Sequence, residues 1–193
     1  PILNDFPSSI LIAGPPSSGK TTMLKDVAYQ ISSGRLGKYY KTTIVDERKE
    51  IINEHNGRES VGLNTDVLYG FSKAYGISLA VRTLSPDYII CDEIGGKNEF
   101  DEILYAMNCG VKFIITVHAE NLSDLKRKEI YKRLVADGII NNVVILETSE
   151  MPCTVSKIIS NNNLIYERNS CNYNNNTICV HYNNLYEKSK VTY

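Results

Sequence analysis

Short apolar runs and helically spaced apolar positions alternate along this chain. A short continuous apolar run bounded by turn residues is typical of a strand buried on both faces, whereas apolar residues three and four positions apart are typical of a helix that packs one side. The predicted elements are strands at 10–13, 42–45, 87–91, 111–117 and 143–146 and helices at 21–33, 68–84, 98–108 and 123–137. This alternation predicts an α/β fold in which helices cover both faces of a mostly parallel sheet.

The C-terminal part of the chain has a different pattern. Two β-type runs at 154–159 and 164–166, separated by the asparagines 161–163, predict a C-terminal β-hairpin. Residues 169–193 are rich in Asn and only weakly patterned, so either an irregular tail or a short added strand fits them. We therefore expect one domain over 1–168, followed by this Asn-rich segment.

The composition narrows the class of protein. The chain has 193 residues, of which 42% are hydrophobic and 22% charged, as expected for one globular domain. The formal net charge of −1 gives no general electrostatic reason to expect a nucleic-acid partner. No apolar run approaches the roughly 20 residues that cross a bilayer, and five cysteines without a C-x-x-C pair favour reduced thiols in the cytoplasm. Because the chain begins with Pro1, we expect a piece of a longer protein. The segment 53–64 is polar and contains glycines, so we expect it to be a mobile loop.

The residues between the first predicted strand and the first predicted helix read GPPSSGKTT and match the phosphate-binding pattern G-x-x-x-x-G-K-[ST]. In such a P-loop the backbone N–H groups and the helix N-terminus surround the phosphates of a nucleotide. We expect Lys20 to reach the β- and γ-phosphates and the Thr21 hydroxyl to ligate Mg²⁺. The candidate nucleotide-binding residues are Gly14, Pro15, Pro16, Ser17, Ser18, Gly19, Lys20, Thr21 and Thr22.

Acidic residues follow two of the predicted strands. Asp92 and Glu93 end the run YIICDE, and with a P-loop upstream we expect Asp92 to hold a Mg²⁺-bound water and Glu93 to polarise the water that attacks the γ-phosphate. Asp46, Glu47 and Arg48 end the strand at 42–45. If that strand lies near the P-loop strand, Glu47 could orient the attacking water or hold Mg²⁺, and Arg48 could contact phosphate or a neighbouring subunit. The alternative is a solvated, charged strand end.

Two further side chains are candidates for contact with the γ-phosphate. His118 follows the strand at 111–117 and could bind the γ-phosphate or Glu93, although a strand-end histidine is often only structural. Arg82 precedes the strand at 87–91 and could sense the γ-phosphate or reach across an interface, or it could be an ordinary surface arginine. The basic segment 126–133 could contact nucleic acid, acidic lipid or a subunit, or it could be a solvated helix face.

Four sequence blocks in this order, ILIAGPPSSGKTTMLKD, IVDERKEI, VRTLSPDYIICDEIG and FIITVHAE, resemble the stage III sporulation protein AA family of endospore-forming bacteria. That family is similar to the hexameric ATPases of type II and type IV secretion systems. The resemblance covers about residues 10–159. It implies a RecA-like ATPase core, Mg-ATP hydrolysis, and a ring with its sites between subunits, acting on a membrane channel between mother cell and forespore.

The resemblance also assigns residues to family motifs. By position, Lys20 and Thr21 fall on the Walker A loop, Asp46 and Glu47 on an aspartate box, Asp92 and Glu93 on Walker B, and His118 on a histidine box. The chain departs from the secretion ATPases in four places. Walker B ends in Asp-Glu rather than Gly-Glu, and the aspartate box reads Asp-Glu rather than Glu-Asp. The histidine box retains only His118, and Arg82 lies one residue farther from the proline than in L-R-x-x-P-D.

We therefore expect a motor ATPase that uses ATP and Mg²⁺ and drives assembly of, or transport through, a membrane channel complex. The candidate catalytic residues are Glu93, Lys20, Glu47, His118 and Arg82, and the candidate metal-binding residues are Thr21, Asp92 and Asp46. The expected partners are ATP, further copies of the chain in a ring and channel proteins, on the mother-cell side and without nucleic acid. The alternative is a nucleotide-gated module that recruits a protein or single-stranded nucleic acid without sustained turnover, and the basic segment 126–133 is its main support.

Overall fold

The computed structural model describes residues 8–35, 37–52, 58–160, 163–168 and 180–182. Its strands are β1 (Ile10–Gly14), β2 (Thr42–Asp46), β3 (Thr65–Tyr69), β4 (Tyr88–Cys91), β5 (Lys112–His118), β6 (Asn142–Leu146), β7 (Val155–Ser160), β8 (Asn163–Arg168) and β9 (Val180–Tyr182). Its helices are α1 (Lys20–Ser32), α2 (Lys73–Thr83), α3 (Lys97–Asn108), α4 (Leu122–Arg127) and α5 (Glu129–Ala136), with a 3-10 turn η2 (Arg58–Val61). Each of these helices is too short or too polar to span a lipid bilayer.

The described strands form one sheet in the order β3-β2-β4-β5-β1-β6-β7-β8-β9. The strands from β3 to β6 pair in parallel, and β7, β8 and β9 continue the sheet in antiparallel pairs. The predicted mostly parallel sheet and C-terminal hairpin are therefore confirmed. β9 pairs with β8, whereas 169–179 and 183–193 lie outside the described residues.

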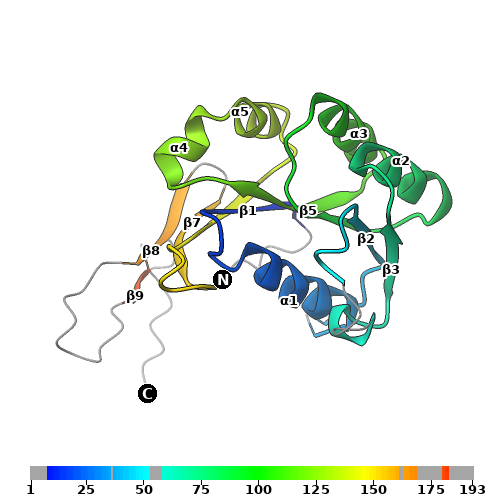
Figure 1. The fold of residues 1–193 in the computed structure, drawn as a ribbon, viewed down its shortest axis with the longest axis horizontal. Helices are drawn as coiled ribbons and strands as arrows, with labels where there is room; N and C mark the ends of the chain where they lie inside the picture. The colour runs from blue at the N-terminus through cyan, green and yellow to red at the C-terminus, as the bar shows by residue number, and fades with distance from the viewer. Residues whose placement is uncertain (1–7, 36, 53–57, 161–162, 169–179, 183–193) are drawn as a thin grey trace, which may run out of the picture.

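Helices cover both faces of the sheet, as Figure 1 shows, with α1 on one face and α2 to α5 on the other. Each face has its own core because parallel strands are apolar on both sides. Under α1 the buried residues include Leu24, Ala28 and Ile31, and under the other helices they include Phe100 and Leu134. Burying one such large side chain contributes about 1.5–3 kcal/mol, so the two layers fix the helices on the sheet.

One predicted helix, 68–84, is partly wrong. Residues 65–69 form β3, the edge strand beside β2, and α2 begins only at Lys73. Gly70 has a positive φ of 78°, and this left-handed backbone interrupts regular secondary structure between β3 and α2. Leu68 lies at helical spacing from the residues of α2, but it belongs to the strand. The fold therefore contains one parallel strand more than the sequence pattern predicts.

The predicted helix 123–137 is interrupted at Lys128, whose ψ of 129° is extended. Leu125 and Tyr131 are both buried in the same core, yet six residues of a straight helix would place them on different sides. The extended residue shifts the helical phase so that both side chains reach the core. Cys109, which follows the last residue of α3, is exposed. Of the segment expected to be a mobile loop, 53–57 lies outside the described residues and 58–61 forms η2.

Candidate functional site

The strand register brings three of the predicted site segments together at the C-terminal ends of the central strands. β4, β5 and β1 are neighbours, with Gly14 level with His118 and Cys91 level with Ile115. Asp92 and Glu93 directly follow Cys91, so they lie beside the C-terminal residues of β5 and close to the phosphate loop. β2 is not adjacent to β1, because β4 and β5 lie between them. At about 4.8 Å per strand, the end of β2 is about 14 Å from the P-loop strand. The condition set for Glu47, that its strand lies near the P-loop strand, is therefore not met.

The loop between β1 and α1 has the tight backbone expected of a phosphate-binding loop. Gly19 has a φ of 90° and Ser17 a φ of 59°, both in the left-handed region. The Ser18 N–H donates to the Pro15 carbonyl at 3.3 Å, which curls the loop. A Cβ atom on Gly14 would come within 2.6 Å of Ser18 Oγ, so this position tolerates no side chain without movement.

Lys20 lies across the mouth of this loop. Its side chain is largely buried, and Nζ donates to the carbonyl oxygens of Gly14 at 3.0 Å and Pro15 at 2.7 Å. Burial lowers the pKa of Lys20 from the usual lysine value, and the nearby carboxylates of Asp92, Glu93 and Glu120 partly oppose that shift. The ammonium group is therefore held at the loop, ready to exchange carbonyl partners for an anion.

The loop fits a nucleotide's phosphates. The Ser18 hydroxyl is fully buried in the loop and has no hydrogen-bond partner, so a polar ligand there would satisfy it. The first N–H groups of α1 also lack intrahelical acceptors and face the same loop. For Mg²⁺ the fit is Thr21 and Asp92, whose Oγ1 and Oδ2 atoms are 2.7 Å apart. The described residues contain no group of three or more His, Cys, Asp or Glu side chains placed to hold a metal, and P-loop Mg²⁺ needs none, because phosphates and waters supply the other ligands.

Thr116 joins the two acidic residues that follow β4. Its side chain is fully buried, its hydroxyl donates to Asp92 Oδ1, and the same hydroxyl accepts the backbone N–H of Glu93 at 2.7 Å. The N–H of Ile94 donates to the Thr116 carbonyl at 3.0 Å. One residue of β5 therefore fixes the backbone that follows β4 from 92 to 94. No sequence motif marks a threonine that positions the residues following a neighbouring strand.

Glu93 has an unusual backbone conformation at the C-terminal end of β4, beside β5. Its φ is 50°, which is uncommon for a residue with a side chain and indicates a conformation that the neighbours must stabilise. The carboxylate is half exposed, and His118 Nε2 lies 3.3 Å from Glu93 Oε1. His118 Nδ1 is buried without a partner, whereas Nε2 is the ring nitrogen that faces the Glu93 carboxylate. The structure thus brings Glu93 and His118 together.

Asp46 has a different neighbourhood from the one a metal ligand would have. Its side chain is buried and accepts the backbone N–H groups of Glu50, Ile51 and Ile52 at 2.9, 3.0 and 2.9 Å. A carboxylate used by three amides organises the loop that follows β2. Glu47, the next residue, points into a hollow at the sheet edge that Asp92 and Glu93 also line.

Lys73, a residue that sequence reasoning missed, also lines that hollow. Its Nζ donates to the carbonyl oxygen of Glu93 at 2.9 Å and lies 3.7 Å from Glu47 Oε2. Lys73 is the first residue of α2, in a stretch without any recognisable motif. In the sequence, only Gly70 indicates that the helix begins near Lys73 rather than earlier.

The turn before β7 also contacts the phosphate loop. The backbone N–H of Cys153 donates to the Ser18 carbonyl at 2.8 Å, and a Cβ atom on Gly19 would lie 2.4 Å from Cys153 Sγ. Gly19 is therefore required both for its φ and for the close approach of Cys153. No local sequence pattern marks Cys153 for this role, because the contact joins segments more than a hundred residues apart.

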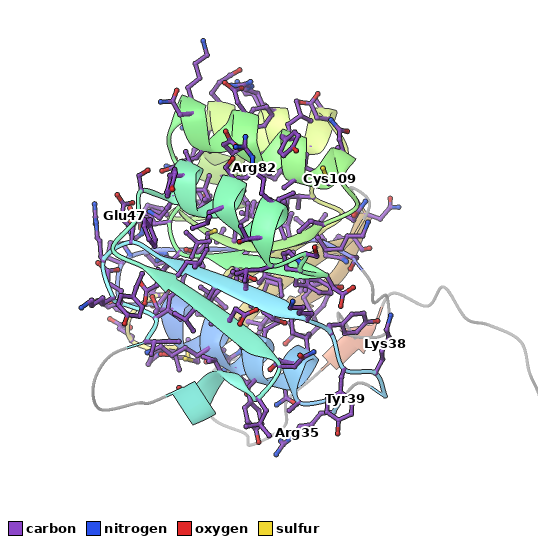
Figure 2. The ribbon with its side chains drawn as sticks, turned by 90° about the vertical axis from the view of Figure 1, so that its right-hand side faces the viewer. Arg35, Lys38, Tyr39, Glu47, Arg82 and Cys109 are labelled. Carbon is purple, nitrogen blue, oxygen red and sulfur yellow. The ribbon has the colours of Figure 1, made fainter. Side chains whose placement is uncertain are left out.

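Arg82 and Arg48 are not brought into this cluster. Arg82 is exposed nine residues along α2 from Lys73, which corresponds to about 13 Å of helix, and Figure 2 shows it well away from Glu47. Arg48 is exposed and lies 3.9 Å from Glu50. Neither guanidinium contacts the P-loop of its own chain.

The basic segment 126–133 is largely balanced by acidic neighbours. Ion pairs join Lys128 to Asp124, Lys132 to Glu129 and Arg133 to Asp101. The Arg133 guanidinium also lies 3.7 Å above the Phe100 ring. These contacts are those of a solvated helix face and give little support to the nucleic-acid alternative.

Comparison with known proteins identifies the family. The family model described as sporulation stage III, protein AA matches residues 2–165. The stage III sporulation protein AA of Bacillus subtilis (strain 168) is 37% identical over 161 residues, which is 82% of this chain and 52% of that protein. The chain thus spans about half the length of this curated relative.

Solved structures agree with the fold. The ATPase DotB of Legionella pneumophila matches with a TM-score of 0.58 at 16% identity, over 80% of this chain and 45% of that one. The VirB11 ATPase of the Brucella suis type IV secretion system, solved in complex with sulphate, matches with a TM-score of 0.57 at 18% identity, over 79% and 48%. The chain therefore has the RecA-like fold of P-loop secretion ATPases, as predicted, and it belongs to the sporulation stage III protein AA family.

Proposed function

We propose that this chain is the motor domain of an ATPase that binds Mg-ATP and hydrolyses it. The observation that carries this proposal is a continuous chain of side-chain contacts from the phosphate loop to a candidate base. Thr21 contacts Asp92, Asp92 contacts Thr116, Thr116 holds the backbone of Glu93, and Glu93 contacts His118. A loop that only binds phosphate needs Lys20 and Thr21, but it does not need a positioned carboxylate beyond them.

The binding half of the proposal rests on the loop itself. Lys20 would leave the carbonyl oxygens of Gly14 and Pro15 and pair with the β- and γ-phosphates, and the hydroxyl of Ser18 would gain a partner. Thr21 and Asp92 would hold Mg²⁺, directly and through water respectively. When bound, the metal supplies positive charge that offsets the negative charge of the β- and γ-oxygens.

The chemical half of the proposal rests on Glu93. A water oxygen forms a bond to the γ-phosphorus while the bond to the ADP oxygen breaks, and the Glu93 carboxylate accepts a proton from that water. His118 holds Glu93 through Nε2 and lies on the P-loop side of it, level with Gly14, where it can also meet the γ-phosphate. We assign Asp46 to positioning the loop that carries Glu47, in place of its predicted role as a metal ligand, and Glu47 to orienting the water with Glu93.

Among the described residues neither Arg48 nor Arg82 contacts the P-loop of its own chain, which favours a shared site. Arg82 is exposed and remote from its own P-loop, so we propose that it acts on the nucleotide of an adjacent copy in a ring. By analogy with the secretion ATPases that it resembles in fold, the complete protein would drive assembly of, or transport through, a membrane channel from the mother-cell side. In this proposal 1–168 is the motor domain and 169–193 an appended segment.

Phosphate release by the full-length protein tests the proposal. The wild type should release phosphate with ATP and Mg²⁺, Lys20→Ala should lose at least about 100-fold in kcat/KM, and Lys25→Ala, on the same helix, should match the wild type. Equal release by the wild type and Lys20→Ala would contradict the proposal.

The ring has a separate test. The mass of the full-length protein should rise to a nucleotide-dependent hexamer with ATP, and mixing Arg82→Ala with Lys20→Ala subunits should restore turnover at sites that combine an intact loop with an intact arginine. An ATP-independent monomer would contradict the shared site and favour a nucleotide-gated binding module.

A further inference from the structure

Lys73 occupies a position that local helix energetics disfavour. It is the first residue of α2, where the positive end of the helix dipole repels a cation, and the first turn of α2 contains no acidic residue. Its side chain is only 11% exposed, although lysine is among the residues least often buried. A residue that breaks two local preferences at the rim of a site is expected to have a task there.

The contacts of Lys73 define that task. Its Nζ donates to the main-chain carbonyl of Glu93 at 2.9 Å and forms an ion pair with Glu47 at 3.7 Å. The N–H of the same Glu93 residue is held by Thr116 Oγ1, and the carboxylate of Glu93 is contacted by His118. The carbonyl, the N–H and the side chain of Glu93 are therefore contacted by three different side chains, one from α2 and two from β5.

The backbone conformation explains why such restraint is needed. Glu93 has a φ of 50°, and a non-glycine residue relaxes from this region unless its surroundings hold it. Without Lys73 the Glu93 carbonyl loses its charged donor, and the peptide after Glu93 is held only by the hydrogen bond from the Ile94 N–H to the Thr116 carbonyl. The carboxylate would then leave the position opposite His118.

The packing of α2 places Lys73 at this distance. Gly76, one turn along α2, lies against β2 so closely that a Cβ atom would be 2.5 Å from Val45 Cγ1. Val45 is the residue before Asp46, so the helix start is pressed against the strand that carries Glu47. A bulkier residue at Gly76 would move Lys73 away from both glutamates.

We propose that Lys73 is a positioning residue that clamps the main chain of Glu93 and the carboxylate of Glu47 into one geometry, so that both carboxylates meet the same water. This inference rests on the proposed ATP hydrolysis. It adds a residue from α2 to a site otherwise built from the P-loop, the start of α1 and strand ends, and it couples the end of β2 to the chemistry beside β4.

Two variants of the full-length protein provide the comparison. Lys73→Met removes the charge and keeps most of the side-chain volume. Lys97→Met makes the same change at the first residue of α3, where the lysine is exposed and forms no ion pair or hydrogen bond among the described residues. Any general effect of removing a cation from a helix start is therefore common to both variants.

Turnover provides the first readout. Lys73→Met should lower kcat by roughly 10- to 100-fold, because small displacements of a reacting group cost about this much, and should change the KM for ATP less than about threefold, because the P-loop is untouched. Lys97→Met should match the wild type, and Lys73→Arg, which can still donate to both groups, should recover part of the loss. Equal kcat in Lys73→Met and Lys97→Met would overturn the inference.

Hydrogen exchange without nucleotide provides the second readout and does not depend on activity. The amides of 92–96 should exchange faster in Lys73→Met than in Lys97→Met, since the clamp has lost one side. Unchanged exchange would overturn the clamp even if kcat falls, and faster exchange with unchanged kcat would overturn its role in turnover. A wild type without turnover would sink the proposed function, whereas the exchange comparison would still decide whether Lys73 holds Glu93.

Discussion

The backbone N–H of Glu93 donates a 2.7 Å hydrogen bond to Thr116 Oγ1. The same hydroxyl donates to Asp92, so one buried threonine on β5 positions both acidic residues beyond β4. Because hydroxyl groups are both donors and acceptors, threonine or serine can make this pair of contacts and valine cannot.

Replacing Thr116 by Val should therefore damage both stability and activity. The Glu93 N–H and Asp92 Oδ1 would each lose a partner, at a combined cost of about 1–3 kcal/mol in the free energy of unfolding, measurable by urea denaturation. Turnover should fall by at least about tenfold. Thr43→Val is the matched control, because Thr43 is also fully buried in a central strand but its hydroxyl has no partner. If the two valine variants behave alike, Thr116 does not organise the site.

Gly19→Ala should be more harmful than a positive φ alone explains. Gly19 has a φ of 90° and a Cβ atom there would lie 2.7 Å from Cys153 N, whereas Gly138 has a φ of 66° and open space around it. Gly138→Ala should cost about 1–2 kcal/mol for the left-handed backbone, and Gly19→Ala should cost more and weaken ATP binding at least about tenfold. Equal unfolding free energies and equal ATP affinities in the two variants would show that the turn carrying Cys153 does not brace the loop.

Asp46→Asn tests whether Asp46 organises a loop or binds metal. Its carboxylate accepts three backbone N–H groups, and an amide would direct its own N–H₂ donors toward at least one of them. We expect a loss of about 1.5–3 kcal/mol in unfolding free energy, with the Mg²⁺ concentration for half-maximal turnover unchanged. Asp66→Asn, on the edge strand β3, serves as control. A tenfold higher Mg²⁺ requirement with unchanged stability would restore the role of metal ligand.

ATP affinity should weaken at alkaline pH because of Lys20. Burial lowers the pKa of Lys20 below the usual 10.5, and only the protonated amine attracts phosphate. Affinity is therefore present below the lowered pKa and should decline as pH rises through it, at a lower pH than for a lysine of ordinary pKa. Lys20→Arg keeps its charge over this range, so its affinity should be lower but flat with pH. A wild-type affinity that is constant up to the usual lysine pKa would contradict a lowered pKa.

The parts of the site that lie within one continuous segment were predictable from the sequence. The P-loop is contiguous, and Asp92-Glu93 follows an apolar run, so the local pattern predicts both the strand end and the acids beyond it. Since the carboxyl ends of parallel strands meet at one edge, the expectation that these groups converge follows from the fold class. The structure bears this out for Thr21, Asp92, Glu93 and His118.

The remaining parts depend on strand order and on long-range contacts. The position of Glu47 relative to the P-loop depends on β4 and β5 lying between β2 and β1, and no local pattern determines that order. Asp46 was predicted as a metal ligand because a carboxylate at a strand end fits that role, but the amides that it accepts lie four to six residues later in an irregular loop. Lys73 begins the helix that follows β3. Because Leu68 of β3 lies at helical spacing from the residues of α2, the sequence pattern placed the helix start too early, and the position of Lys73 at the helix start was not predicted.

The most direct test of the central claim is the Glu93→Gln variant of the full-length protein, with ATP affinity and single-turnover hydrolysis measured on the same sample. The account predicts that ATP affinity stays within about threefold of the wild type while the hydrolysis rate falls by at least about 100-fold, because glutamine keeps the shape of the side chain but cannot accept the proton of the attacking water. Hydrolysis by Glu93→Gln at the wild-type rate would contradict the assignment of Glu93 as the base.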